Sequence, residues 1–114
     1  MRGSAPLTEP ESGFFRAVNV DDLPWRASTI ASGVFVKDIA QTDGWEMQIV
    51  RVDPGARFPT HTHERAEFLF ILEGELVHGG RRLGPGWARV AGAGTVDDDV
   101  HSEIGCVFVL VDRA

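Results

Sequence analysis

The chain of 114 residues contains little cysteine, little positive charge and no long apolar run. A single cysteine, Cys106, excludes an intramolecular disulfide, and residues 1–4 are not followed by the apolar stretch of a secretory signal, so we expect a cytoplasmic protein. No run approaches the ~20 apolar residues that a membrane span requires, so we expect no membrane association. The formal net charge is −6 and the basic residues are scattered, which argues against a nucleic-acid partner.

Helical periodicity is also nearly absent, apart from one turn expected near residues 21–24. Short runs rich in Val, Ile, Phe and Trp predict strands instead, at residues 33–39, 45–52, 66–77, 87–91 and 106–111. Glycine-containing turn signals, among them residues 42–44 and 78–80, separate these runs. Several short strands at this spacing predict an all-β sandwich or barrel. We expect one domain over residues 21–114, preceded by an N-terminal extension, residues 1–20, that is flexible.

The segment after Gly55 carries the polar residues that call for a chemical explanation. His61 and His63 are one residue apart, so in a strand their side chains project to the same side. Glu67 begins the next apolar run and can lie beside them if the two strands pair. Two imidazoles and a carboxylate inside a barrel are costly unless a cation satisfies them, and this mixture suits Zn, Fe, Ni or Mn.

The spacing of this segment is Gly55, five residues, His61, one residue, His63, three residues, Glu67, six residues and Gly74. It resembles the first motif of the cupin family at every fixed position. Four further stretches resemble one subgroup of that family, the single-domain cupins related to the C-terminal domain of the ChrR anti-sigma factor and to acetylacetone-cleaving dioxygenases. These stretches are LPWRAS from residue 23, GVFVKDIA from 33, RVDPGARFPTHTH from 51 and SEIGCVFVLV from 102.

The resemblance implies a small jelly-roll barrel, also called a double-stranded β-helix, that holds one divalent metal ion. It implies that His61, His63 and Glu67 are three of the ligands. Fe2+ or Zn2+ is the expected metal, with Mn2+ and Ni2+ as alternatives. It also implies a homodimer, because cupins of this kind are commonly dimeric.

The second cupin motif is where the chain departs from the pattern. The motif runs glycine, five residues, proline, one residue, glycine, two residues, histidine, three residues and asparagine. Gly86 and Gly94 fit its two glycines, but Gly92 stands at the proline, Asp97 at the histidine and His101 at the asparagine. We favour His101 as the fourth ligand, brought in by a shifted loop. The alternatives are that Asp97 is the fourth ligand or that the site keeps an open position. Four residues of extended strand span ~13 Å, too far for both to reach one metal.

Strand alternation also predicts what surrounds the metal. Leu69 and Ile71 share the face of Glu67, and with Met47 or Ile49 they predict an apolar pocket for a small organic substrate. Phe68, Phe70 and Leu72 lie on the opposite face, where they either pack between sheets or form a patch for a partner subunit. His78, at a predicted turn, is expected to be solvent-exposed rather than catalytic. Cys106 is expected to be a small buried hydrophobe.

These features favour a metal-dependent enzyme, specifically an oxygenase that cleaves a C–C bond next to a carbonyl. One alternative is a regulatory module that senses a metal or ligand, as the ChrR resemblance implies. Another is a cupin isomerase or lyase without redox chemistry. The fold alone does not decide among them, because one barrel hosts many chemistries.

Overall fold

The computed structural model of the protein describes residues 15–113. A single turn of 3-10 helix, η1 (Val20–Asp22), precedes eleven strands in this part of the chain. The strands are β1 (Arg26–Ala27), β2 (Val34–Thr42), β3 (Trp45–Val52), β4 (His61–Thr62), β5 (Glu67–Gly74), β6 (Leu76–His78), β7 (Arg81–Leu83), β8 (Ala88–Ala91), β9 (Val96–Asp97), β10 (Val100–His101) and β11 (Cys106–Arg113). Most of the predicted flexible extension, residues 1–14, lies outside the described residues. Within residues 15–113, no helix is long and apolar enough to cross a membrane.

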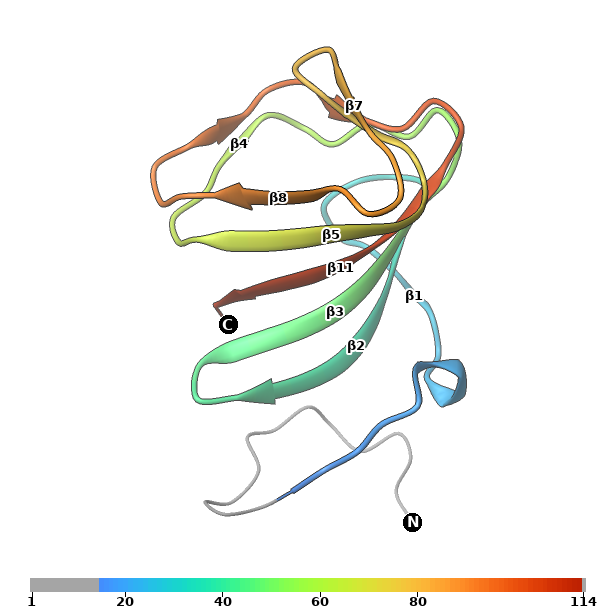
Figure 1. Ribbon diagram of the computed structural model, residues 1–114, viewed down its shortest axis with the longest axis vertical. Coiled ribbons are helices and arrows are strands. Elements are labelled where there is room, and N and C mark those ends of the chain that lie inside the picture. The colour runs from blue at the N-terminus through green and yellow to red at the C-terminus, as the bar shows by residue number, and fades with distance from the viewer. Residues whose placement is uncertain (1–14, 114) are drawn as a thin grey trace.

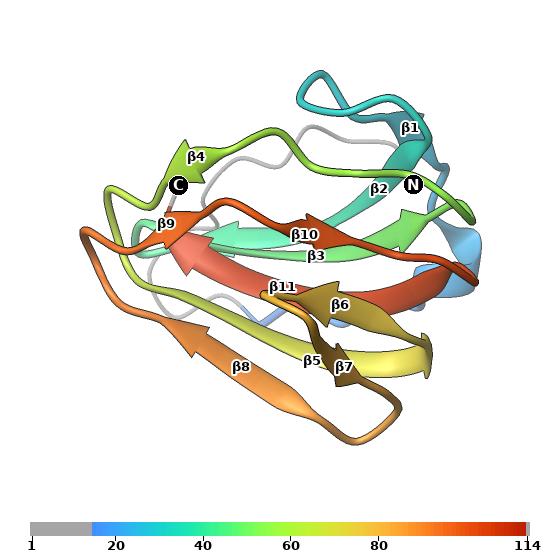
Figure 2. The same ribbon diagram turned by 90° about the horizontal axis from the view of Figure 1, so that it is seen from above.

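The strands form two layers. A six-stranded sheet has the order β1-β2-β3-β11-β5-β8, and all of its neighbouring strands run antiparallel. Two smaller sheets, β10-β6-β7 and β4-β9, form the second layer. Figure 1 shows the strands of the large sheet side by side. Figure 2 shows the small sheets in front of the large sheet. The structure confirms the all-β barrel fold predicted from the sequence.

The core lies between the two layers, and it is built by alternate residues of each long strand. On β5, Leu69 and Ile71 are buried, whereas Phe68, Phe70 and Leu72 on the opposite face are 42–46% exposed. The period of two places one set of side chains inside and the other outside. The buried cluster that joins the layers comprises Val34, Val36, Val50, Val52, Leu69, Ile71, Leu76, Leu83, Val100, Cys106 and Phe108.

Two hairpins follow directly from turn signals in the sequence. Asp43 and Gly44 connect β2 to β3 with φ values of 53° and 79°, and Gly79 and Gly80 connect β6 to β7 with φ values of 57° and 79°. Positive φ at both central residues is the type I′ turn, whose twist matches paired antiparallel strands. These turns fix the register in which β2 pairs with β3 and β6 pairs with β7.

Gly74, the last fixed position of the first motif, closes β5 for a steric reason. Its φ is 71°, and a Cβ there would overlap the backbone of Gly105 and Cys106 at the start of β11. Only glycine allows the two backbones to approach this closely. The position therefore ties the end of β5 to β11, the strand that lies beside it in the sheet.

Candidate metal centre

The candidate metal centre lies where β4 pairs with β9. His61 of β4 is directly opposite Asp97 of β9 in this antiparallel pair. His63 follows β4 directly, and two backbone hydrogen bonds fix its position. Its N–H donates to the Thr95 carbonyl over 2.8 Å, and its carbonyl accepts from the Gly94 N–H over 2.7 Å. These bonds bring the His-x-His segment and the second-motif loop together, although they are more than thirty residues apart in the sequence.

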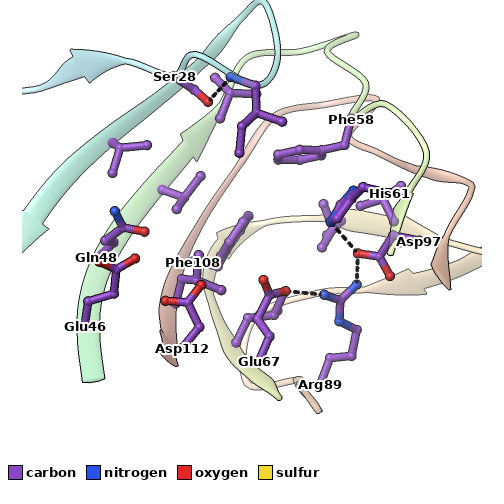
Figure 3. A pocket seen from close by; sticks show the side chains of 18 of the residues that line it. Ser28, Glu46, Gln48, Phe58, His61, Glu67, Arg89, Asp97, Phe108 and Asp112 are labelled. Carbon is purple, nitrogen blue, oxygen red and sulfur yellow. Dashed lines mark hydrogen bonds and ion pairs between the residues drawn. The ribbon is translucent and has the colours of Figure 1, made fainter. Parts of the chain in front are cut away.

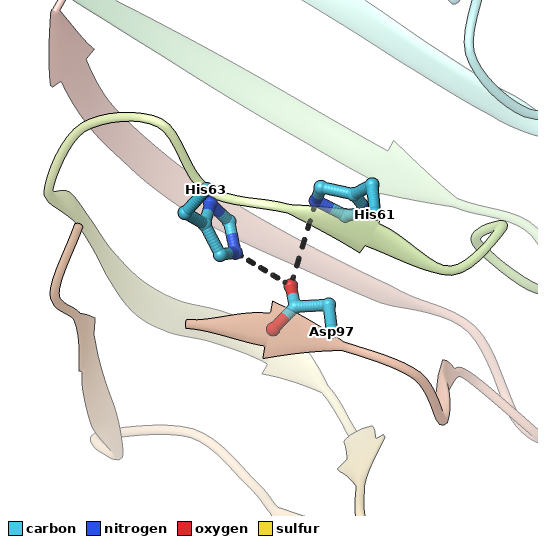
Figure 4. A group of neighbouring side chains, drawn as sticks. All are labelled: His61, His63 and Asp97. Atoms are coloured by element: carbon cyan, nitrogen blue, oxygen red, sulfur yellow. Dashed lines mark hydrogen bonds and ion pairs between the residues drawn. The ribbon is translucent and has the colours of Figure 1, made fainter. Parts of the chain in front are cut away.

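Three side chains converge on one point in this pair of segments. The Asp97 Oδ2 atom lies 2.9 Å from His63 Nε2 and 3.7 Å from His61 Nε2. One donor atom from each of the three residues lies within 4.8 Å of the others. Figure 4 shows both imidazole rings directed at the same carboxylate. His63 and Asp97 are buried, whereas the His61 side chain is 38% exposed and forms the accessible side of the cluster.

The tautomer of His61 suits a metal ligand. Its Nδ1 atom lies 3.0 Å from the carbonyl oxygen of Pro59, which can only accept, so Nδ1 carries the proton. The neutral ring then has its lone pair on Nε2, the atom that faces Asp97. Metal-ligating histidines characteristically donate their other ring N–H to a carbonyl or carboxylate in this way.

Asp97 is ionised in this environment. Burial would by itself raise the pKa of the carboxyl, but the hydrogen bond with His63 and the charge of Arg89 outweigh it, so the pKa of Asp97 lies below its ordinary value. His78 also approaches, with Nε2 3.6 Å from Asp97 Oδ1. A buried carboxylate that stays charged between two histidine Nε2 atoms is a strong candidate ligand.

Glu67, the third ligand predicted from the first motif, lies beside this cluster but is held by another residue. Its Oε1 atom accepts from Arg89 Nη2 over 2.8 Å, and its Oε2 atom lies 3.6 Å from His63 Nδ1. The guanidinium of Arg89 also lies 3.4 Å from Asp97 Oδ2. Arg89 therefore sits between the two carboxylates and neutralises part of their charge.

The structure does not bring His101 into the cluster. Its ring faces Asp99, with Nδ1 3.4 Å from Oδ1, and Glu103, with Nε2 3.7 Å from Oε2. Strand β10, which carries His101, pairs with β6, whereas β9, which carries Asp97, pairs with β4. The two residues therefore lie in different sheets. Of the two fourth-ligand candidates, Asp97 is the one placed beside His61 and His63.

A cavity of about 320 Å³ adjoins the cluster (Figure 3). His61, Glu67, Arg89 and Asp97 line one end of it. Most of its wall is apolar and comes from the core and its margins, namely Ile30, Val34, Val36, Val50, Phe58, Leu69, Leu76, Val100, Phe108 and Leu110. The volume lies at the lower end of the range for small-molecule sites, which suits a small substrate.

The opposite side of the cavity is polar, contrary to expectation. The prediction that Met47 or Ile49 lines it is wrong, because the residues of β3 that line it are Glu46, Gln48 and Val50, while Met47 is 41% exposed. The apolar alternation of Trp45, Met47 and Ile49 belongs to the outer face of the sheet. Ile71, also expected in the pocket, is fully buried in the core and is not among the residues that line the cavity.

Next to Glu46, Asp112 of β11 completes this polar wall. Its Oδ1 atom is buried and makes no hydrogen bond. Burial and the neighbouring Glu46 raise the pKa of Asp112 to about 7. Figure 3 shows Glu46, Gln48 and Asp112 across the cavity from His61 and Asp97.

The donor set fits a divalent metal ion. Two imidazoles and a carboxylate are the ligands that Fe, Zn, Mn and Ni accept, and the His61 tautomer presents a free lone pair. The charges of Asp97, Glu67 and Arg89 sum to one negative charge when the histidines are neutral. A divalent cation at the cluster would more than offset this charge.

Sequence reasoning missed two residues of the site, Arg89 and His78. Arg89 interrupts a short apolar run, and an internal charge in such a run is a signal that its side chain has a buried partner. His78 was expected at an exposed turn, but its side chain is 31% exposed and reaches Asp97 from β6. No local pattern predicts that contact, because it depends on how β6 and β9 lie in the second layer.

The chain belongs to the cupin family described as the ChrR Cupin-like domain, whose model matches residues 15–113. This assignment confirms the subgroup indicated by the four further stretches, which resemble the ChrR-related cupins. No match was found among curated proteins.

Solved structures share the fold at low sequence identity. A candidate acetylacetone dioxygenase from Methylibium petroleiphilum is 15% identical with a TM-score of 0.81, over 94% of this chain and 82% of that one. An acetylacetone dioxygenase from Acinetobacter johnsonii is 10% identical with a TM-score of 0.73, over 93% and 77%. In a complex of SigE with the anti-sigma ChrR from Rhodobacter sphaeroides, the matched chain is 20% identical with a TM-score of 0.68, over 84% of this chain and 51% of that one.

Proposed function

We propose that this protein is a metal-dependent dioxygenase that cleaves a C–C bond next to a carbonyl in a small organic substrate. The observation that carries the proposal is the convergence of His61, His63 and Asp97 at one end of an apolar cavity. Two histidines and one carboxylate with open positions form the ligand set typical of non-haem Fe(II) oxygenases. The fold shared with acetylacetone dioxygenases supports the same reaction class.

The roles of the chain's own residues follow from their positions. His61, His63 and Asp97 would hold the metal, and the apolar wall would bind the hydrocarbon part of the substrate and exclude water. A divalent metal held there would supply Lewis acidity for a carbonyl oxygen and, as Fe2+, the redox capacity that reaction with O2 requires. Gln48 and Glu46 lie opposite the metal ligands and would contact a polar substituent at the far end of the substrate.

The proposal is tested by loading the metal-free protein anaerobically with Fe2+ or with Zn2+ and measuring O2 uptake with small diketones. We expect uptake that depends on the diketone, with carboxylic acid product, in the Fe2+ protein only. Asp97→Ala should abolish it, while His101→Ala should retain it. Equal uptake by the Fe2+ and Zn2+ forms, or none by either, would contradict dioxygenase activity.

The second candidate is a module that senses a metal or a ligand, which membership of the ChrR Cupin-like family favours. The same experiment separates the two candidates. A protein that binds metal tightly but consumes no O2 with any diketone would favour sensing. A metal-bound protein that converts a substrate without O2 would instead favour an isomerase or lyase.

We further propose a homodimer formed through the outer face of the large sheet. Trp45, Met47, Phe68, Phe70 and Val90 on this face are each at least 37% exposed. An apolar face of this kind is a common mark of a subunit contact. Sedimentation equilibrium should give a dimer, and Phe70→Glu should give a monomer; a parent protein that stays monomeric at high concentration would contradict this.

A cytoplasmic location stays a prediction.

A further inference from the structure

The first motif places Glu67 where a metal ligand is expected, but the structure pairs one of its oxygen atoms with Arg89 and places the other near the Nδ1 atom of His63. Oε1 accepts from Arg89 over 2.8 Å, and the two side chains are partly buried, at 16% and 11% exposure. Oε2 lies 3.6 Å from Nδ1 of His63. Neither of these two contacts of Glu67 involves the donor atoms that converge on Asp97.

His63 separates Glu67 from that convergence point. The ring directs Nε2 at Asp97 over 2.9 Å and Nδ1 at Glu67, so the two carboxylates lie on opposite sides of one imidazole. If Nε2 binds a metal, its lone pair is used and the proton of the neutral ring must be on Nδ1. That N–H then faces Glu67 Oε2, the arrangement in which a carboxylate orients a metal-bound histidine.

Arg89 has the contacts needed to keep Glu67 in this position. Its Nη2 donates to Glu67, and its Nη1 lies 3.4 Å from both Asp97 Oδ2 and His78 Nδ1. Because Arg can only donate, His78 Nδ1 must accept, so the proton of neutral His78 is on Nε2, which faces Asp97 Oδ1. The guanidinium is thus held from several sides, and an ion pair in a buried setting is costly to break by removing one partner.

We infer that Arg89 withholds Glu67 from the metal and that Glu67 acts as a positioning residue for His63, so that the metal is held by two histidines and one carboxylate, Asp97. This inference rests on the proposed metal site. It adds that Glu67, one of the three ligands that the first motif implies, stays outside the ligand set, and that an open position for substrate results from the Arg89–Glu67 pair.

The test uses Co2+, whose visible absorption reports the number and kind of its ligands. The metal-free parent is titrated alongside the double variant Glu67→Gln with Arg89→Met, which replaces the ion pair by neutral side chains of similar size. If Glu67 is not a ligand, the double variant should keep the band positions and intensities of the parent. Its affinity should fall by ~10–100-fold, the usual cost of losing outer support of a ligand.

Asp97→Asn is the matched control, because it removes a carboxylate that the inference counts as a ligand. Its Co2+ spectrum should differ from that of the parent. A changed spectrum in the double variant, resembling the change in Asp97→Asn, would overturn the inference and leave the metal site itself in place. A parent protein that binds no Co2+ would overturn the proposed metal site, and the inference with it. Circular dichroism of each variant confirms that the β fold is retained.

A second measurement reads the positioning role directly. In the Zn2+-loaded parent, the Nδ1 proton of His63 should give a downfield imidazole resonance in the NMR spectrum, because a carboxylate accepts it. Glu67→Ala should remove that resonance or shift it strongly upfield, while Zn2+ still binds. An unchanged His63 resonance in Glu67→Ala would contradict the positioning role.

Discussion

Asp112→Asn should stabilise the protein above neutral pH, although it removes a charged side chain from the structure. Asp112 lies on β11 directly between Glu46 of β3 and Glu67 of β5 in the register of the sheet. Burial, followed by the charge and hydrogen bond of Glu46, raises the pKa of the Asp112 carboxyl to about 7. In the unfolded chain an aspartate titrates near 3.9.

The sign of the effect follows from proton linkage. Between pH ~4 and ~7 the folded state binds more protons at Asp112 than the unfolded state, so the free energy of unfolding falls as pH rises through this window. A difference of about three pKa units corresponds to ~4 kcal/mol at most. Because the side chain is only partly buried and solvent screens its charge, we expect ~1–2 kcal/mol.

The assay is urea unfolding of the metal-free protein at several pH values between 4 and 8. Asp112→Asn should unfold at higher urea than the parent at pH 8, and the two should converge toward pH 4. Asp38→Asn is the control of opposite sign, because the hydrogen bond from Arg26 lowers the pKa of Asp38 and stabilises its ionised form. Parallel stability curves for parent and Asp112→Asn, or a less stable variant at pH 8, would refute the reasoning.

Three further outcomes are expected. Gly74→Ala should lower the free energy of unfolding by about 2 kcal/mol or more, because φ is 71° and the new methyl group would overlap the backbone of Gly105. Urea unfolding measures this change, and a variant about as stable as the parent would contradict the prediction. Cys106 should react with iodoacetamide at pH 8 only after unfolding, because burial raises the pKa of its thiol to about 11; rapid labelling of the folded protein would be inconsistent with this. Asp97→Ala should weaken Zn2+ binding at least ~10-fold and His101→Ala should not, as followed by competition with a chelating dye; the reverse ranking would restore His101 as the ligand.

Much of the fold is encoded in local patterns of the sequence. The five predicted apolar runs correspond to β2, β3, β5 with β6, β8 and β11, and within 66–77 only Glu75 separates β5 from β6. The turn signals at residues 42–44 and 78–80 are type I′ hairpins, because their glycines permit the positive φ values that such turns need. Local propensity and local steric limits suffice for these features.

The very short strands were harder to predict. Two-residue strands such as β4 and β9 are defined by pairing between distant segments, so no run of their own marks them. The orientation of β3 was also ambiguous. Both of its faces carry apolar residues, and the more regular set, which includes Met47, faces outward. Alternation identifies two faces, but only the partner layer decides which of them is buried.

The candidate site likewise contains some residues that sequence motifs identify and others that they do not. His61, His63 and Glu67 stand out because their spacing matches a motif, and Asp97 was identified as an alternative because it occupies the histidine position of the second motif. The roles of Arg89 and His78 depend on contacts across strands that are distant in sequence. Such contacts follow from topology and register, which local patterns do not contain.

The most direct test of the account is the metal content of protein purified without added metal, measured by elemental analysis beside His61→Ala and His63→Ala. We expect about one divalent metal ion per chain in the parent and little or none in either variant, because each histidine supplies an imidazole that no neighbouring residue replaces. Circular dichroism should show the same β spectrum for all three proteins. A parent protein free of metal even after incubation with Fe2+ or Zn2+, or variants that keep the parent's metal content, would contradict the assignment of His61, His63 and Asp97 as a metal centre.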